Sequence, residues 1–301
     1  QMPTLRREGY RFRPHLRGHP ALRRLLVFLG PALIGLATIQ VGIVVDLQLA
    51  AAFGDGPASW LNYAFRIVQL PMSLFAGAVG VAGLALLSIQ VAKKDFDQAR
   101  STQSEALSLT SFFVLPSAVG LAVFAWPLVS LLYERGAFTS TDTASTALFL
   151  QVYSLGIFAF CLHRVIVPAF YAWHDPWTPM VLSILTVVLK VPLALWLTTA
   201  TWLGVLGIPL AHVMVVVVEV ALMFTLLTRR SGGWSPGFGL AILKMGLAAV
   251  IMGEVGWLVF DDWSPFLTTF VAIPVCGLFY LALTHLIGLP YGAKVWARLR
   301  R

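Results

Sequence analysis

Ionisable side chains inside the long apolar segments are the residues of this sequence whose types could do chemistry. Besides three histidines, these are Asp46, Arg66, Arg164, Lys190, Glu219, Lys244 and Glu254. A charge in hydrocarbon is costly, so each such residue is a functional candidate that needs a partner. Lys244 and Glu254 lie near the ends of their segments, where a lysine reaches the headgroups and a glutamate is solvated.

Arg66 differs from the other charges because its neighbours are polar at regular intervals. Asn62, Tyr63, Arg66 and Gln69 follow one another at spacings of three and four, which places them on one face of a helix. A guanidinium stays charged and binds phosphate with two parallel hydrogen bonds. We therefore predict that these four residues bind a phosphate-bearing substrate; the alternative for Arg66 is a structural ion pair with Asp46.

Depth in the membrane suggests two further pairs. At about 1.5 Å per residue, Asp46 and Lys190 lie about 10 and 14 Å from the outer ends of their helices, which makes them a candidate ion or ion-pair site. Arg164 and Glu219 each lie about 14 Å from the cytoplasmic ends, and we expect an internal pair with a structural role. A single histidine in an apolar helix is more often packed and hydrogen-bonded than a ligand.

Composition excludes several classes of protein. Hydrophobic residues make up 58% and charged residues 11% of the 301 positions, whereas a soluble chain carries about a quarter charged residues. The net charge of +8 comes from basic residues at helix ends, so nucleic-acid binding is not expected. Cys161 and Cys276 lie in apolar runs, without the spacing of a disulfide framework or metal site. No motif of a catalytic nucleophile or general base is present, so we expect neither enzymatic chemistry nor a cofactor.

The apolar runs predict an all-α polytopic membrane protein. A helix needs roughly 20 apolar residues to cross the hydrocarbon. Eight runs are long enough, at about 25–53, 59–92, 106–133, 143–173, 179–199, 203–228, 238–260 and 264–288.

The distribution of Lys and Arg predicts the orientation. If the spans alternate, sixteen of the 21 Lys and Arg residues fall on one side, in 1–24, 93–100, 229–230 and 290–301. Because positively charged loops stay cytoplasmic, both termini are expected there. This predicts a basic cytoplasmic segment at 1–24, a six-helix unit at 25–230, two additional helices at 231–289 and a basic cytoplasmic tail at 290–301.

Several motifs resemble one family. They are GLATIQVGIVVDLQLA, GDGPASWLNYAFRIVQLPMSLFAGAVG, LPSAVGLAVFAWPLVSLLYERGAF and VYSLGIFAFCLHRVIVPAFYAWHDPWTP, within which YAxRxxQLP, RGAF and AFYAxxDPxTP are the most specific in combination. Together they resemble the MurJ/MviN lipid II flippases of the multidrug/oligosaccharidyl-lipid/polysaccharide exporter superfamily. The resemblance is good over residues 1–230 and loose afterwards.

The resemblance implies a fold and a function. Members have fourteen spans, in two six-helix lobes plus two extra helices, and this chain looks like the second lobe with the last two helices. The implied activity is alternating-access transport of lipid II, an undecaprenyl-pyrophosphate-linked peptidoglycan precursor, or of a similar polyprenyl-pyrophosphate lipid, across the bacterial cytoplasmic membrane. The first lobe, which supplies further cavity arginines in relatives, is expected in cis or in trans.

The resemblance also implies roles for individual residues. Arg66 matches the family's cavity arginine, although Phe65 stands where an acidic residue often precedes it. Asp46 matches an acidic residue that helps to bind sodium in some relatives, and Lys190 and Ala194 stand at the accompanying positions. A lysine cannot coordinate sodium. We therefore hypothesise that the Lys190 ammonium replaces the ion and makes transport sodium-independent. The sequence leaves the energy source open between a membrane potential and an ion gradient.

Two other functions stay open at the level of the sequence. One is export of a drug or of another polyprenyl-linked saccharide, but such relatives usually have twelve spans, so the two extra helices favour lipid II. The other is a non-transporting membrane scaffold for cell-wall synthesis, which the absence of a first lobe leaves open. Eight prolines within the spans favour a transporter with bent helices over a passive anchor.

Overall fold

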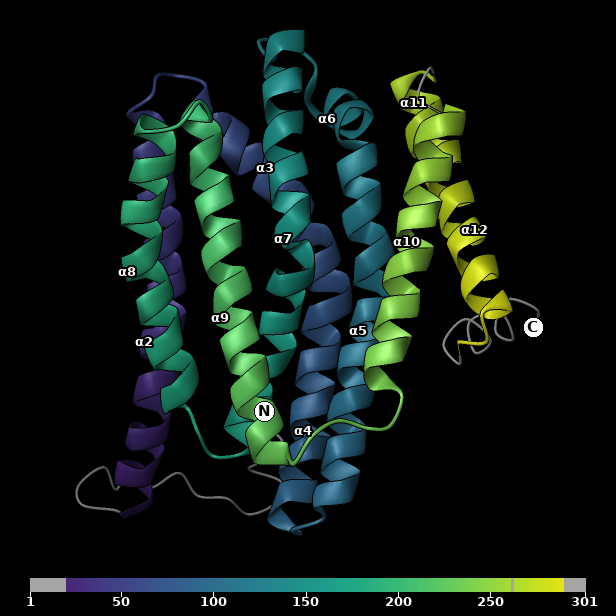
Figure 1. The fold of residues 1–301 in the computed structure, drawn as a ribbon. Coiled ribbons are helices and arrows are strands. Elements are labelled where there is room, and N and C mark those ends of the chain that lie inside the picture. The colour runs from purple at the N-terminus through teal and green to yellow at the C-terminus, as the bar shows by residue number, and fades with distance from the viewer. Residues whose placement is uncertain (1–19, 261–262, 290–301) are drawn as a thin grey trace, which may run out of the picture.

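The computed structural model describes residues 20–260 and 263–289, and this part of the chain is built from helices joined by short turns (Figure 1). Within it, eight helical segments are long and apolar enough to cross a membrane. The prediction of an all-α protein with about eight spans is confirmed. The tail at 290–301 and most of the basic segment at 1–24 lie outside the described residues, and the cytoplasmic placement of the termini stays a prediction.

The first six spans are made of eight α-helices and two short irregular helices. They are α2 (Pro20–Ala51), α3 (Pro57–Pro71), the π-helix η1 (Met72–Gly77), α4 (Ala78–Ala92), α5 (Phe96–Val123), α6 (Ala125–Tyr133), α7 (Ser140–Ala172), α8 (Trp177–Thr199), the 3-10 helix η2 (Gly204–Leu206) and α9 (Gly207–Ser231). The predicted span 59–92 thus consists of α3, η1 and α4, and its irregular turn follows Pro71, whose ring cannot continue a regular hydrogen-bond ladder.

The predicted third span, 106–133, differs most from the structure. α5 begins at Phe96, where the Asp95 carboxylate caps the helix by accepting a hydrogen bond from Gln98 N at 3.2 Å. It ends at Val123, and α6 follows as a separate short helix. The apolar run marks only the membrane-embedded part of this helix, because its polar first turns extend beyond that part.

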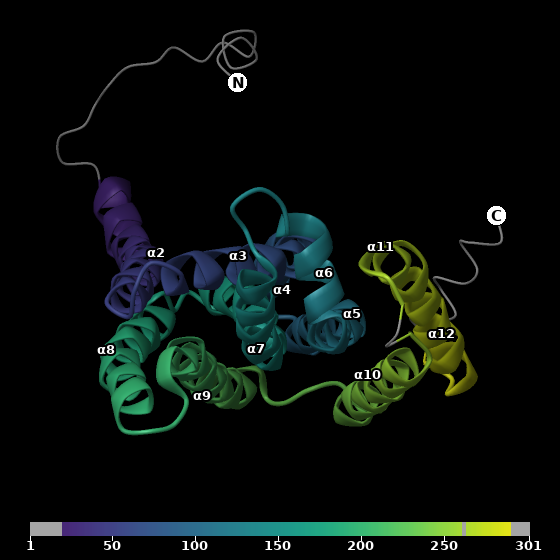
Figure 2. The ribbon, with the colours of Figure 1, turned by 90° about the horizontal axis from the view of Figure 1, so that it is seen from above.

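α7 is the centre of the six-span unit. Seen from above, α2, α8 and α9 follow one another around its side, while α3, α4 and α5 pack on it from other directions (Figure 2). About two thirds of its most apolar window is buried inside the protein. Its side chains Tyr153, Ile157, Ile166 and Phe170 are almost completely buried in the larger hydrophobic cluster. α3, α4, α5 and α9 are therefore positioned by one shared partner, while α2 and α8 join the unit mainly through each other and through α9.

The two additional helices pack beside this unit. They are α10 (Phe238–Phe260) and α12 (Ile273–Leu286), the latter preceded by α11 (Pro265–Leu267) and the π-helix η3 (Thr268–Ala272). α10 lies along α5, and a second hydrophobic cluster joins α5, α10 and α12 through Phe112, Met245 and Tyr280. Gly253 permits the close approach of α10 to α5, since a Cβ there would lie against the side chain of Val119.

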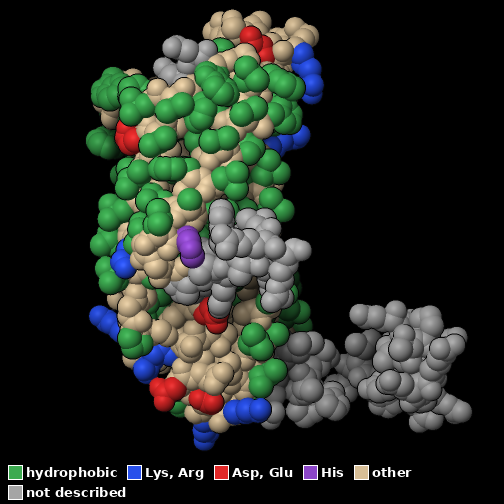
Figure 3. All heavy atoms as spheres, turned by 90° about the vertical axis from the view of Figure 1, so that its right-hand side faces the viewer, with side chains coloured by type: hydrophobic (Ala, Val, Ile, Leu, Met, Phe, Trp, Pro, Cys, Tyr) green, Lys and Arg blue, Asp and Glu red, His purple; other side chains and the backbone are tan. Residues whose placement is uncertain are grey.

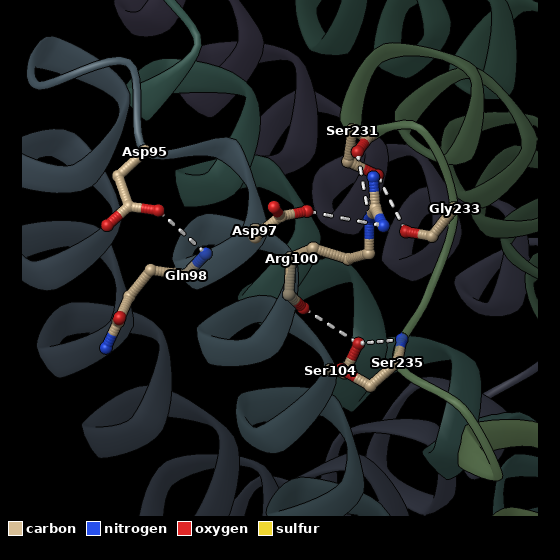
Figure 4. A network of polar contacts seen from close by, with 8 residues as sticks. All are labelled: Asp95, Asp97, Gln98, Arg100, Ser104, Ser231, Gly233 and Ser235. Carbon is tan, nitrogen blue, oxygen red and sulfur yellow. Dashed lines mark hydrogen bonds and ion pairs between the residues drawn. The ribbon is translucent and has the colours of Figure 1, made fainter.

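The linker between α9 and α10 is held against the start of α5 (Figure 4). Arg100 Nε donates to the carbonyl of Ser231 at 3.4 Å and its guanidinium pairs with Asp97 at 3.7 Å. Ser104 Oγ donates to the carbonyl of Arg100 at 2.8 Å and accepts from Ser235 N at 2.9 Å. These contacts fix the two additional helices to the six-span unit at one end.

The outer surface on the side of α10 and α12 is suited to lipid. Hydrophobic side chains cover the upper and middle parts of this face, and most of its charged side chains gather toward the lower end (Figure 3). Exposed apolar residues of α10 and η3 include Leu243, Leu247, Trp257, Leu258 and Phe270. Such a band matches a hydrocarbon environment rather than water.

Replacing Gly80 tests how closely α4 and α7 cross. A Cβ at this position would lie 2.6 Å from the carbonyl oxygen of Arg164, a backbone atom that cannot turn aside. Gly80→Ala is therefore expected to destabilise the chain by about 1–3 kcal/mol. Gly246→Ala is the control, because a Cβ there meets nothing within 4 Å and alanine favours helix. Thermal unfolding of the purified chain in detergent should separate the two variants; equal midpoints would contradict the close crossing.

Candidate functional site

A cavity of about 890 Å³ lies among α2, α3, α4, α7, α8 and α9. Most of its wall is apolar, but several polar and charged side chains reach it: Gln40, Gln69, His163, Arg164, Tyr171, Ser183, Thr186, Lys190, His212 and Glu219. Polar groups at membrane depth are tolerated where they meet one another or a water-filled space. The cavity is therefore the candidate site for ion or substrate chemistry within this unit.

Asp46 and Lys190 lie together beside this cavity. Their side chains are 4% and 3% exposed, and Lys190 Nζ lies 2.9 Å from Asp46 Oδ1. The ammonium also donates to the carbonyl of Gly42 at 2.8 Å, and His212 Nδ1 lies 3.0 Å from Asp46 Oδ2. The structure thus brings the expected pair into contact and adds His212, whereas Arg66 is not among the ion-pair partners of Asp46. The cluster ties α2 to α8 and α9.

Gly42 makes room for the ammonium group. A Cβ at this position would lie 3.1 Å from Lys190 Nζ and 3.3 Å from Val187 Cγ2. Without a side chain, the backbone carbonyl of α2 is open to the lysine, which offers up to three N–H donors. Sequence reasoning missed Gly42, because a single glycine in an apolar helix carries no sign of which neighbour approaches it.

Glu219 has a different partner from the one expected. Ser183 Oγ donates to Glu219 Oε1 at 2.8 Å, and His163 Nε2 lies 3.4 Å from the same oxygen. The expected pair of Arg164 with Glu219 is therefore corrected to His163 with Glu219. Consecutive residues of a helix point about 100° apart, so only one of the two can face α9. Arg164 is exposed and lines the cavity instead.

The cavity wall contains two polar layers. Ser183 and Lys190 are seven residues apart on α8, and His212 and Glu219 are seven apart on α9. Seven residues are close to two helical turns, so each pair faces one direction with its members about 10 Å apart. This shared spacing was a signal that could have placed His212 in the same layer as Lys190, whereas it carries no information on His163 of α7.

The polar face of α3 divides into two parts. Arg66 Nε donates to Asn62 Oδ1 at 2.9 Å, and the Tyr63 ring lies 4.6 Å from that of Tyr133 on α6. Gln69 lines the cavity. Arg66 is exposed, and no carboxylate of the described residues forms an ion pair with it. Its guanidinium is therefore available to an anionic ligand outside the cavity.

Comparison with known proteins gives the family. The sequence model described as "Lipid II flippase MurJ" matches residues 1–277. The chain belongs to the MurJ family. It is 33% identical over 297 residues to a probable lipid II flippase MurJ of Rhizobium meliloti (strain 1021), covering 95% of this chain and 54% of the relative. Lipid II flippase MurJ of Burkholderia cenocepacia is 28% identical over 252 residues, 82% of this chain and 48% of the relative. The chain thus spans about half the length of these MurJ proteins.

Solved structures agree with this assignment. A lipid II flippase MurJ in an inward closed conformation superposes with a TM-score of 0.75 at 25% identity, covering 93% of this chain and 57% of that one. The Vibrio cholerae MATE transporter VcmN in the bent form gives 0.64 at 17% identity, covering 92% and 68%, which shows the shared fold alone. The MurJ match and the eight apolar helices identify a multi-pass inner membrane protein with the fold of this exporter superfamily.

A double-mutant cycle tests the buried pair on α2 and α8. Lys190→Met leaves the Asp46 carboxylate buried without its cation and is expected to cost about 3–5 kcal/mol of stability. Adding Asp46→Asn should recover much of that loss, because the uncompensated charge is then gone. Thermal unfolding in detergent measures both effects. Lys244→Met on α10 is the matched control, and a loss as large as that of Lys190→Met would argue against a specific pair.

Proposed function

We propose that the protein of which this chain forms part transports lipid II across the inner membrane. The match to the MurJ family over residues 1–277 carries the proposal, and the relatives above bear the name lipid II flippase. The chain supplies six spans, α2 to α9, and the two additional helices α10 and α12. A companion six-span lobe, in the same polypeptide or in a separate one, completes the transporter.

Arg66 is the proposed contact to the pyrophosphate of the lipid. Its guanidinium is exposed on α3, where Asn62 accepts one hydrogen bond from Nε and thereby orients the planar group. The two Nη groups form the fork that pairs with phosphate oxygens. Asn62 and Tyr63 lie on the same helical face and are proposed to contact the same headgroup, while Gln69 faces the cavity behind it.

Movement of the two lobes past each other is the proposed transport step. Repeat-built transporters bind substrate at a charged site near the bilayer midplane and rock one repeat against the other. Helices of this chain that are mainly exposed, such as α2 with exposed Leu33, Leu36 and Val44, offer a surface for that contact or for lipid. No covalent step is part of this mechanism.

Lys190 is proposed to serve as the built-in counter-charge of Asp46. The ammonium occupies the space between the carboxylate and the Gly42 carbonyl, two oxygen atoms that a small cation would otherwise bind. A second positive charge in the same place would be repelled. The Asp46 site therefore takes no mobile sodium ion.

Arg66 variants of the complete protein test the headgroup assignment. Arg66→Ala removes two charge-assisted hydrogen bonds, so lipid II translocation in proteoliposomes is expected to fall about 10- to 100-fold. Arg66→Lys keeps the charge without the fork and should recover only part of the activity. Arg135→Ala, in the loop after α6, is the control. Unchanged translocation by Arg66→Ala would remove this residue from the substrate site.

Sodium replacement tests the role of Lys190. Translocation by the complete protein is expected to proceed at the same rate in sodium chloride and in choline chloride of equal osmolarity, because the Asp46 site already contains its cation. The flipping rate with a fluorescent lipid II analogue provides the measurement. Strict sodium dependence, or a sodium ion found between Asp46 and α8, would contradict the proposal.

A further inference from the structure

Glu219 is a buried carboxylate at the centre of the six-span unit. It lies midway along α9, is 5% exposed and faces both α7 and α8. Its Oε1 atom accepts a hydrogen bond from Ser183 at 2.8 Å and lies 3.4 Å from His163 Nε2. Together with His163 and Ser183 it lines the cavity, so protons can reach it through any water there.

The two buried carboxylates in and beside the cavity differ in their counter-charge. Asp46 has the permanent ammonium of Lys190 at 2.9 Å. Among the described residues, the ion-pair partner of Glu219 within 4 Å is His163, an imidazole that is charged only when protonated. An ionised carboxylate buried without a counter-charge carries a large desolvation cost. The positive counter-charge of Glu219 must therefore be supplied by a species that binds and dissociates.

We propose that Glu219 and His163 together bind one proton, which makes the middle of this unit a proton-binding site. Adding the proton changes the net charge of the pair from −1 to 0. The proton resides on the imidazole as an imidazolium next to a carboxylate, or on Glu219 as a carboxylic acid next to a neutral imidazole. The two groups titrate as one unit in either case. Ser183 keeps its hydrogen bond to the glutamate oxygen in both forms.

Neighbouring charges leave this pair responsive to protons. On α8, Lys190 is already neutralised by Asp46 of α2, and on α9 His212 contacts that same aspartate. On α7, the Arg164 guanidinium lines the cavity and favours the deprotonated pair, which opposes the desolvation cost. α2 and α3 add the neutral Gln40 and Gln69.

Two further charged groups meet the far end of α9. Arg100 of α5 hydrogen-bonds to Ser231, about 18 Å along the axis from Glu219, and Asp175 pairs with Arg230, about 16 Å from it. Their influence on the pair is small at these distances. Protonation of Glu219 and His163 therefore affects the packing of α7, α8 and α9 directly, because a net negative charge among these three helices disfavours their contact. This role is independent of the lipid that the complete protein carries.

Thermal unfolding of the purified 301-residue chain in detergent tests the site. Midpoints are measured from pH 5.5 to 8.5 at constant ionic strength in choline chloride, for the wild type and for His163→Asn, Glu219→Gln and the double variant. The matched controls are His174→Asn, an exposed histidine of the α7–α8 turn, and Glu254→Gln, an exposed glutamate of α10.

The expected result follows from proton linkage. The folded pair holds a proton that an unfolded histidine releases above about pH 6.5, so unfolding releases a proton in that range. The contribution of the pair to the free energy of unfolding is then fully present at low pH and is lost as the pH rises. The unfolding constant increases by up to about tenfold per pH unit. This component of the fall is absent in Glu219→Gln and in the double variant, it is shifted to another pH range in His163→Asn, where the carboxyl remains alone, and the controls follow the wild type.

Two results would overturn the proposal. One is a wild-type pH dependence in the double variant, which lacks both groups, because the pair then cannot be the source of that dependence. The other is a rise of the wild-type midpoint when sodium replaces choline at fixed pH, abolished by Glu219→Gln, which shows that a metal cation is the counter-charge. If Glu219→Gln does not fold, NMR spectra of the wild type with isotope-labelled histidine give the protonation state of His163. An unprotonated His163 next to an ionised glutamate at neutral pH refutes the site.

Discussion

The cost of placing a charge in hydrocarbon is the constraint on which the rest of this structure depends. Asp46 and Glu219 cannot face lipid, so the helices that carry them turn them inward, where α7, α8 and α9 supply partners. Both carboxylates have a histidine partner, but Asp46 also has the permanent cation of Lys190. That single difference in partner separates a fixed ion pair, which ties helices together, from a pair whose charge depends on a proton.

Close helix crossings leave room for these polar groups. Hydrophobic burial contributes little between helices in a membrane, so their association relies on tight packing and small residues. Gly80 lets α4 touch the backbone of α7 at Arg164, and Gly207 lets the start of α9 approach Leu197 at the end of α8. Where the helices diverge between such contacts, a cavity remains, and the polar side chains collect on its walls.

The sequence predicted the spans well because membrane thickness sets their length. The ranges expected for α8 and α10 agree closely with the structure, whereas the start of α5 was missed because its polar first turns leave the apolar region. Depth along the helix placed Asp46 beside Lys190. Depth could not show which of His163 and Arg164 pairs with Glu219. The rotation of a helix about its axis, and so the neighbour that each side chain meets, is determined by tertiary packing.

α3 connects the proposed lipid site with the ion chemistry of the cavity. Arg66 and Asn62 lie on its exposed side, while the preceding Phe65 lines the cavity with its ring 6.2 Å from that of His212. Pro71 and the π-helix that follows interrupt the regular ladder below this point. A rotation of α3 that carries Arg66 toward or away from a headgroup must therefore move Phe65 against His212. Arg66 outside the cavity and Phe65 in its wall are thus carried by the same helix.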